Sequence, residues 1–330
     1  MLFRSFGQKI IELLGAKKIH PSWAVPGGVR SPLSEEGREW IRDRLPESRQ
    51  TLETALNLFK QLLDRFQTEV ETFGNFPSLF LGLVGKEGEW EHYGGHLRFT
   101  DSDGNIVADN LSEDDYRDFI GESVEKWSYL KFPYYKPLGY PDGIYRVGPL
   151  ARLNVCSHFG TPAADRELVE YRQRAGGVAT SSFFYHYARL LEILGCLEHI
   201  ERLLDDPDIL SHRTRAEAGI NKLEGIGVSE APRGTLFHHY LVDENGLIEK
   251  VNLIVATGNN NLAMNKTVAQ IAKHYVRGSE IAEGMLNRVE AGIRAYDPCL
   301  SCSTHAAGQM PLHVQLVGTD GQVLREIWRD

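Results

Sequence analysis

The stretch D-P-C-L-S-C-S-T-H at positions 297–305 carries the strongest information in this 330-residue sequence. It places two of the chain's four cysteines, Cys299 and Cys302, around a tight bend that follows a helix-like segment. Thiolates at this spacing can bind one soft metal ion, and a nearby imidazole or carboxylate can bind a second ion. The spacing alone also allows a buried thiol pair, a redox dithiol or half of a structural zinc site. Asp297 and His305 bracket the thiols and favour a metal centre.

Length and composition indicate a globular chain with enough residues for one sizeable core or two smaller ones. The net charge of -9, without a long run of Lys or Arg, argues against a nucleic-acid partner. Arg4 and Lys9 interrupt the first apolar stretch, so we expect neither a transmembrane segment nor a secretory signal. Four cysteines are too few for a secreted disulfide framework, which predicts a cytoplasmic protein.

Apolar residues three and four positions apart predict several long helices. Pro46 should break or kink the first of them. The segment 127–145 is rich in aromatic residues and prolines, and we expect it to be an irregular crossing. The predicted helices cover 34–73, 181–204, 262–277 and 279–294.

Alternating apolar residues around turn sequences predict strands and hairpins. Asn245-Gly246 is the clearest turn of this kind. No G-x-G-x-x-G fingerprint is present, so we expect no dinucleotide-binding fold. The predicted extended segments are a strand at 79–84 and hairpins at 97–109, 235–255 and 314–327.

Three segments together give the sequence a resemblance to a known family. They are the 297–305 motif, E-A-P-R-G at 230–234 and V-A-T-G-N-N at 255–260. In combination they resemble the large, catalytic subunit of nickel-iron hydrogenases, and the similarity extends over essentially the whole chain. The NAD-linked bidirectional branch is the most similar. The resemblance implies reversible cleavage of dihydrogen and an α+β, mainly helical fold, with a central helix bundle and peripheral β-hairpins.

The same resemblance implies roles for individual residues at a nickel-iron centre whose iron carries carbon monoxide and cyanide. Cys299 would be a terminal nickel ligand, Cys302 a bridging one, and His305 would bind a nearby magnesium ion. Arg233 would lie over the open position between the two metals. Its permanently charged, planar guanidinium suits a base or a group that orients the reactants electrostatically. Asp297 is the candidate carboxylate to hold that guanidinium in place. Taken alone, an arginine after a proline is more often a surface ion-pair former.

The resemblance implies roles for two further residues, Thr257 and Pro232. Thr257 would donate a hydrogen bond to a cyanide nitrogen, and Pro232 would lie against the same cofactor. At this place the family carries Pro-Thr or Pro-Ser, whereas this chain has Ala before Thr257, which leaves an ordinary strand-end threonine as the alternative. Cys156 and Cys196 carry no pattern and are predicted to be core thiols.

The resemblance also implies partners. Iron-sulfur clusters would lie in a separate small subunit, because this chain has too few cysteines to hold clusters of its own. A flavin-containing diaphorase would then pass electrons to NAD, which should not touch this chain. Nickel-insertion factors and a maturation protease are implied as well. Residues 1–305 would form the large-subunit domain, and 306–330 would be a C-terminal extension removed after His305.

One part of the family pattern is missing. Family members carry a C-G-x-C pair near the N-terminus, whereas this sequence has no cysteine before Cys156. We therefore expect an N-terminally truncated large subunit that supplies half of the metal ligands. Two alternatives remain: a respiratory-complex subunit that kept the fold and lost the metal, and an inactive fragment that only binds partner subunits. The paired cysteines count against the first, and the missing pair supports the second.

The DNA upstream of Met1 tests the truncation. We expect an in-frame C-G-x-C sequence there, because two thiolates cannot reproduce a metal site that has four sulfur ligands. A stop codon followed by an independent ribosome site would instead indicate a decayed copy.

Overall fold

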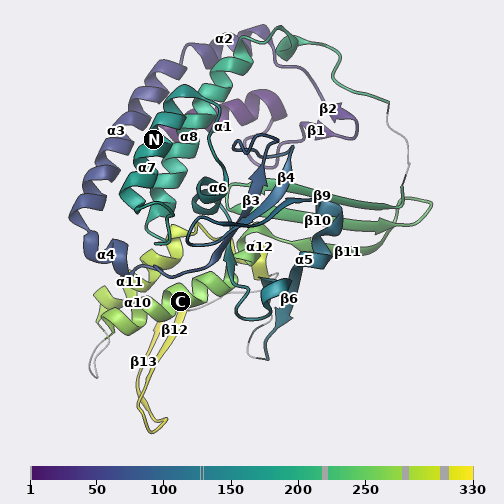
Figure 1. The fold of residues 1–330 in the computed structure, drawn as a ribbon. Coiled ribbons are helices and arrows are strands. Elements are labelled where there is room, and N and C mark those ends of the chain that lie inside the picture. The colour runs from purple at the N-terminus through teal and green to yellow at the C-terminus, as the bar shows by residue number, and fades with distance from the viewer. Residues whose placement is uncertain are drawn as a thin grey trace.

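A bundle of long helices forms one side of the molecule and several small sheets form the other (Figure 1). The computed structural model describes residues 2–126, 128, 130–217, 222–276, 282–304 and 312–329. This arrangement is the mainly helical α+β fold with peripheral hairpins that the sequence predicts. The cysteine loop and the arginine turn both lie where the bundle meets the sheets.

The bundle is built around α3 (Leu45–Arg65), α7 (Pro162–Ala175) and α8 (Phe184–Leu204). Its core contains the predicted apolar stripe of α3 and the side chains of α8 that face it. The predicted helix over 34–73 is three helices, α2 (Glu35–Arg42), α3 and α4 (Gln67–Thr72). Pro46 lies in the first turn of α3, where its missing N–H removes no helical hydrogen bond.

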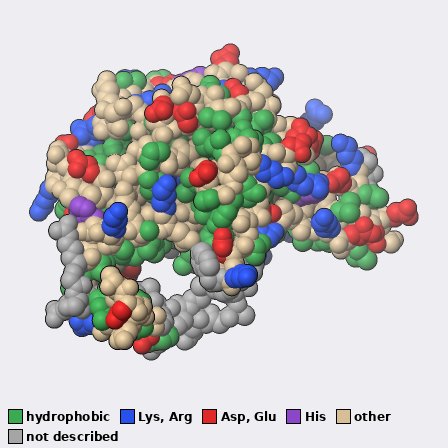
Figure 2. Space-filling model, turned by 60° about the horizontal axis from the view of Figure 1, so that its bottom comes forward, with side chains coloured by type: hydrophobic (Ala, Val, Ile, Leu, Met, Phe, Trp, Pro, Cys, Tyr) green, Lys and Arg blue, Asp and Glu red, His purple; other side chains and the backbone are tan. Residues whose placement is uncertain are grey.

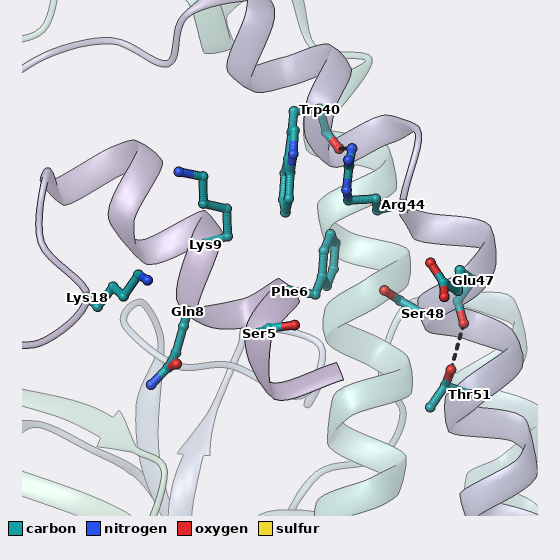
Figure 3. A pocket seen from close by; sticks show the side chains of 10 residues that line it. All are labelled: Ser5, Phe6, Gln8, Lys9, Lys18, Trp40, Arg44, Glu47, Ser48 and Thr51. Carbon is teal, nitrogen blue, oxygen red and sulfur yellow. Dashed lines mark hydrogen bonds between the residues drawn. The ribbon is translucent and has the colours of Figure 1, made fainter. Parts of the chain in front are cut away.

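The helix α1 (Leu2–Gly15) packs across the start of α3. Phe6 stacks on Trp40 of α2 with ring centroids 6.0 Å apart, and the guanidinium of Arg44 lies 4.2 Å from the Trp40 ring (Figure 3). A cavity of about 300 Å³ opens beside this stack. No helix in the described part of the chain is long and apolar enough to cross a membrane.

The central sheet has the strand order β5-β4-β3-β8. Every residue of β3 is buried, because α6 (Pro149–Val155) packs against one face and a cluster that includes Phe237 packs against the other. The predicted strand and hairpin are confirmed, and the Asp101 carboxylate fixes the turn by accepting from the Asp103 and Asn105 amides. The strands are β3 (Leu79–Val84), β4 (His96–Thr100), β5 (Ile106–Leu111) and β8 (Tyr145–Arg146).

A second sheet contains β9 (Glu224–Ala231), β10 (Gly234–Val242) and β11 (Ile248–Ile254) in the order β11-β10-β9. The hairpin predicted over 235–255 is therefore confirmed. The strand β9 was not predicted from the sequence, because Gly225 and Gly227 stand between its apolar residues and glycine weakens a strand.

The expectation of an irregular crossing over 127–145 is wrong for 131–135, which form a strand, whereas 139–144 is irregular. The strand β7 (Lys131–Tyr135) pairs with β6 (Ile120–Val124) in an antiparallel ribbon. Pro133 fits there because a two-stranded ribbon leaves one edge of each strand unpaired, so its missing N–H breaks no ladder. Trp127 and Tyr129 lie outside the described residues.

The remaining elements are short strands, short helices and the C-terminal helices and hairpin. The tail hairpin predicted at 314–327 is confirmed. These elements are β1 (Ala24–Val25), β2 (Gly28–Val29), η1 (Glu113–Asp115), α5 (Tyr116–Phe119), η2 (Lys136–Leu138), η3 (Pro207–Leu210), α9 (Ala256–Asn259), α10 (Asn261–Tyr275), α11 (Glu283–Ala295), α12 (Leu300–Thr304), β12 (Leu312–Val317) and β13 (Val323–Arg329).

Arg146 joins the helix bundle to the central sheet. Its side chain is fully buried, and its guanidinium lies 4.2 Å from the ring of Phe76. It donates to the Ser78 hydroxyl at 3.0 Å and to the carbonyl oxygens of residues 74, 76 and 180. Those carbonyls belong to the loop from α4 to β3 and to the loop from α7 to α8. One side chain thus supplies hydrogen-bond donors to two loops.

Replacing Arg146 by Met should destabilise the chain, because several buried carbonyls lose their donor at once. We expect the free energy of unfolding to fall by roughly 3 kcal/mol, given about 1–3 kcal/mol for each buried polar group left unpaired. Urea denaturation measures the change. Arg294→Met is the control, since the ion pair of Arg294 with Glu290 is largely exposed and should contribute less than about 0.5 kcal/mol. Equal effects of the two substitutions would contradict this role.

Candidate metal centre

The arginine of the E-A-P-R-G segment lies in a tight turn between β9 and β10. Ala231 and Gly234 pair across the hairpin, so Pro232 and Arg233 form the turn itself. Gly234 has φ +136°, and a Cβ there would lie 2.2 Å from the side chain of Val147. Only glycine fits this position, which lets the turn pack directly on the start of α6.

The cysteine motif begins at a fixed point at the end of α11. Tyr296 is buried, and its hydroxyl lies 2.9 Å from the Ser182 hydroxyl and 2.8 Å from the Thr267 hydroxyl. Asp297 follows in the left-handed region with φ +50° and turns the chain away from the helix. The motif then continues through Pro298 into α12, whose place near the inner ends of β9 and β10 is visible in Figure 1.

The arginine turn and the cysteine motif meet through Arg233 and Asp297. The Nη2 atom of Arg233 lies 3.4 Å from Oδ2 of Asp297, and its Nε donates to the Asp297 carbonyl oxygen. The two side chains are 35% and 51% exposed, so the ion pair itself contributes at most about 1 kcal/mol. Its effect is to orient the guanidinium, and it brings together the two residues that the sequence analysis paired.

Thr257 joins the same site. Its side chain is buried, and its hydroxyl oxygen accepts a hydrogen bond from the Cys299 amide at 3.2 Å. The hydroxyl keeps its own proton for another acceptor. The geometry therefore brings Thr257 beside the cysteine motif, whereas Pro232 lies on the exposed side of the arginine turn.

Three consecutive asparagines hold the Thr257 segment in place. Asn259 donates to the Thr235 carbonyl at 2.8 Å, Asn260 accepts from the Val147 amide at 2.9 Å, and Asn261 donates to the Lys131 carbonyl at 2.9 Å. Each asparagine thus binds a different strand or loop. The sequence gives no signal for this role, because all the partners are far away along the chain.

The two thiols of the motif contact one another. The Cys302 thiol, followed by the Ser301 hydroxyl and the charge of Arg233, lowers the pKa of Cys299 below its ordinary value. The pKa of Cys302 is raised, first of all by Cys299. The two thiols therefore lose their protons at different pH values, and two adjacent sulfur donors of this kind suit a soft cation.

The donor set fits two adjacent positions of a soft metal centre and no more. In the described ranges, no cluster of three or more Cys, His, Asp or Glu side chains could hold a metal ion. His305 lies outside those ranges. Cys156 and Cys196 pack in the core, where burial raises the pKa of each thiol to about 12, so both are the core thiols that the sequence predicts.

A cavity of about 370 Å³ lies beside the motif, between the β6–β7 ribbon, β11 and α12. Lys131 and Glu122 line one wall, and Gly258, Asn261 and Ser303 line the other. Figure 2 shows apolar side chains gathered in the middle of the face turned forward, with basic side chains beside them.

Comparison with known proteins identifies the family. Residues 90–305 match the family model of the nickel-dependent hydrogenases. The chain is 42% identical to the NAD-reducing hydrogenase HoxS subunit beta of Cupriavidus necator, over 99% of this chain and 69% of that protein. It is 38% identical to a protein of the F420-non-reducing hydrogenase of Methanothermobacter thermautotrophicus, over 97% of this chain and 68% of that protein. The chain belongs to the nickel-dependent hydrogenase family.

Solved structures agree with this assignment. A crystal structure of an NAD⁺-reducing NiFe hydrogenase in the H2-reduced state superimposes with a TM-score of 0.88 and 42% identity, over 92% of this chain and 67% of that one. The NiFeSe hydrogenase of Dm. baculatum shares the fold, with a TM-score of 0.69 at 20% identity, over 92% and 67% of the two chains. Within the family, the chain is thus similar to an NAD-reducing enzyme.

In the metal-free chain, the two thiols should become reactive toward an alkylating reagent at different pH values. Because a lowered pKa produces thiolate at lower pH, iodoacetamide should modify Cys299 at a lower pH than Cys302. Mass spectrometry of peptides alkylated across a pH series measures both midpoints. Cys302→Ala removes the hydrogen bond to Cys299, so the Cys299 midpoint should move upward. Identical midpoints for the two cysteines would contradict the contact between them.

Proposed function

We propose that this chain is the catalytic large subunit of a nickel-iron hydrogenase that cleaves dihydrogen reversibly into protons and electrons, coupled through partner subunits to NAD. The observation that carries the proposal is the contact between Arg233 and Asp297, which shows that the arginine turn and the cysteine motif lie side by side. The 42% identity to an NAD-reducing hydrogenase subunit supports the choice of electron acceptor.

Cys299 and Cys302 would hold the nickel-iron centre through their thiolates. Thr257 would donate a hydrogen bond from its hydroxyl to a cyanide of that centre, with Pro232 beside it, and His305 would bind magnesium. The fit rests on the paired thiols and on a buried hydroxyl whose proton is available. When bound, a nickel-iron centre supplies a Lewis-acid site that polarises dihydrogen.

Arg233 would act beside the metals without binding them. Its guanidinium keeps its charge at all working pH values, so it stabilises developing negative charge and holds a thiolate ionised. Asp297 restrains the guanidinium through two contacts, one from the carboxylate and one from the carbonyl. That restraint fixes the position of the charge before the reaction begins, which is the condition under which fixed charges are most effective.

Partner subunits would carry the electrons away. The chain has two cysteines outside the motif, Cys156 buried and Cys196 half-buried, which are too few to hold an iron-sulfur cluster. An iron-sulfur small subunit would receive the electrons, and flavin-containing diaphorase subunits would pass them to NAD. We place the assembly in the cytoplasm. Nickel-insertion factors would load 1–305, and a maturation protease would then remove 306–330.

A second function is a subunit that binds partners without turnover. The comparisons do not favour it, and the reason to test it is that the motif supplies two of the four sulfurs that the resemblance implies. Metal analysis separates the two functions, since stoichiometric nickel with hydrogen uptake excludes a purely structural role.

The proposal is tested by producing the chain together with its partner subunits and maturation factors. We expect stoichiometric nickel and NAD-dependent hydrogen uptake, and we expect Cys299→Ser to lose both because a nickel ligand is removed. Arg233→Lys should keep nickel yet lower kcat by roughly 100-fold, the usual effect of removing one fixed electrostatic donor. Nickel content by mass spectrometry and hydrogen uptake are the measurements.

Cys196→Ala is the matched control, because this core thiol should affect neither nickel nor uptake. Full nickel occupancy in Cys299→Ser would contradict the assignment of the ligand. Absence of nickel and of uptake in the unmodified complex would favour the partner-binding function.

A further inference from the structure

Arg152 is a buried cation that the proposed chemistry does not use. It lies on α6, only 2% exposed, and its guanidinium is bound on three sides. Nε and Nη2 bind the two carboxylate oxygens of Glu192 on α8, at 2.5 and 2.8 Å. Nη1 binds Glu230 at the end of β9, at 2.7 Å. One guanidinium thus connects a strand and two helices.

Both carboxylates are buried and hydrogen-bonded by further donors. Glu192 accepts from the Trp90 indole at 3.0 Å, and Glu230 accepts from the Thr235 hydroxyl at 2.8 Å and the Leu83 amide at 3.1 Å. Buried charges of this kind hold their geometry tightly, because any displacement leaves a desolvated charge without its partner.

Arg152 also reaches the arginine turn itself. Nη1 donates to the Ala231 carbonyl at 3.0 Å, and Nη2 lies 3.5 Å from the Pro232 carbonyl. These are the two residues that precede Arg233. Gly148 immediately precedes α6, and a Cβ there would lie 2.7 Å from the Arg233 carbonyl oxygen. The start of α6 therefore contacts the turn as well.

The turn is therefore held by α6 from two directions. Its own backbone pairing ends at Ala231 and Gly234, so the strands alone do not fix the two residues between them. A lysine at position 152 would keep the charge, yet it could not place donors on two carboxylates and a carbonyl at once, because an ammonium lacks the planar fork.

We propose that Arg152, held by Glu192 and Glu230, is a positioning residue that fixes the turn carrying Arg233 at the metal centre. The inference rests on the proposed function only in taking Arg233 as the group that acts there. Arg152 itself touches no reacting atom. It positions Arg233 through its contacts with the carbonyls of Ala231 and Pro232. Glu192, on α8, acts on the turn only through Arg152.

Arg98 offers a matched control. It too is a buried arginine with a bidentate carboxylate, since Nε and Nη2 bind Asp109 at 2.9 Å each. Its Nη1 donates to the Val155 carbonyl at the far end of α6, at 3.2 Å. Arg98→Lys therefore removes the same kind of interaction at the opposite end of the same helix, away from the turn.

The test compares Arg152→Lys, Glu192→Gln and Arg98→Lys in the assembled, nickel-loaded complex. Hydrogen–deuterium exchange of the amides of Ala231, Arg233, Gly234 and Thr235 reports on the turn, and exchange at 79–84 reports on the sheet. We expect Arg152→Lys to speed exchange in the turn at least about tenfold and Glu192→Gln at least about threefold, with the sheet unchanged. The same two variants should lower kcat for hydrogen uptake by at least about tenfold, with KM for hydrogen unchanged.

Arg98→Lys should leave both exchange in the turn and kcat within about twofold of the unmodified complex. If Arg152→Lys fails to assemble, Glu192→Gln decides alone, because it removes one charge and leaves every contact to the turn available. The proposal would be overturned if Arg152→Lys and Glu192→Gln both showed the same exchange rates in the turn and the same kcat as Arg98→Lys. A complex without nickel or uptake would instead defeat the proposed function, while the exchange comparison would still decide whether Arg152 holds the turn.

Discussion

The contact between Arg233 and Asp297 is the constraint on which the site depends. These residues are 64 positions apart, and each stands at the end of a rigid element, the β9–β10 hairpin in one case and α11 in the other. An exposed ion pair is too weak to bring two loops together by itself. The loops meet because the elements behind them are fixed, and the ion pair then sets the direction of the guanidinium.

The elements behind the loops are fixed by buried polar side chains. Arg146 supplies donors to the loops between α8 and the central sheet, and the asparagines at 259–261 bind three separate strands or loops. Tyr296 anchors the start of the cysteine motif through two hydroxyls. Buried polar groups of this kind must be paired, so they define the position of their neighbours more narrowly than apolar packing does.

Much of the fold could be predicted from local patterns. The hairpin at Asn245-Gly246 and the stripe of α3 follow from turn chemistry and helical spacing, and the structure has both. The strands β7 and β9 were not predicted, because Pro133 and the glycines of β9 disfavour a strand in a prediction from sequence. Arg152 carries no local signal either, since its carboxylate partners are 40 and 78 residues away. Short motifs thus indicated the chemistry, whereas the residues that position those motifs could be found only in three dimensions.

The most direct test is X-ray absorption spectroscopy at the nickel edge of the assembled complex. The central claim is that the sulfur atoms of Cys299 and Cys302 bind nickel beside the arginine turn. We expect a sulfur-rich coordination shell in the unmodified complex, and we expect Cys302→Ser, like Cys299→Ser, to lower the nickel content and to leave fewer sulfur neighbours around the nickel that remains. A nickel shell of nitrogen and oxygen donors, or a sulfur shell unchanged by that substitution, would contradict the claim.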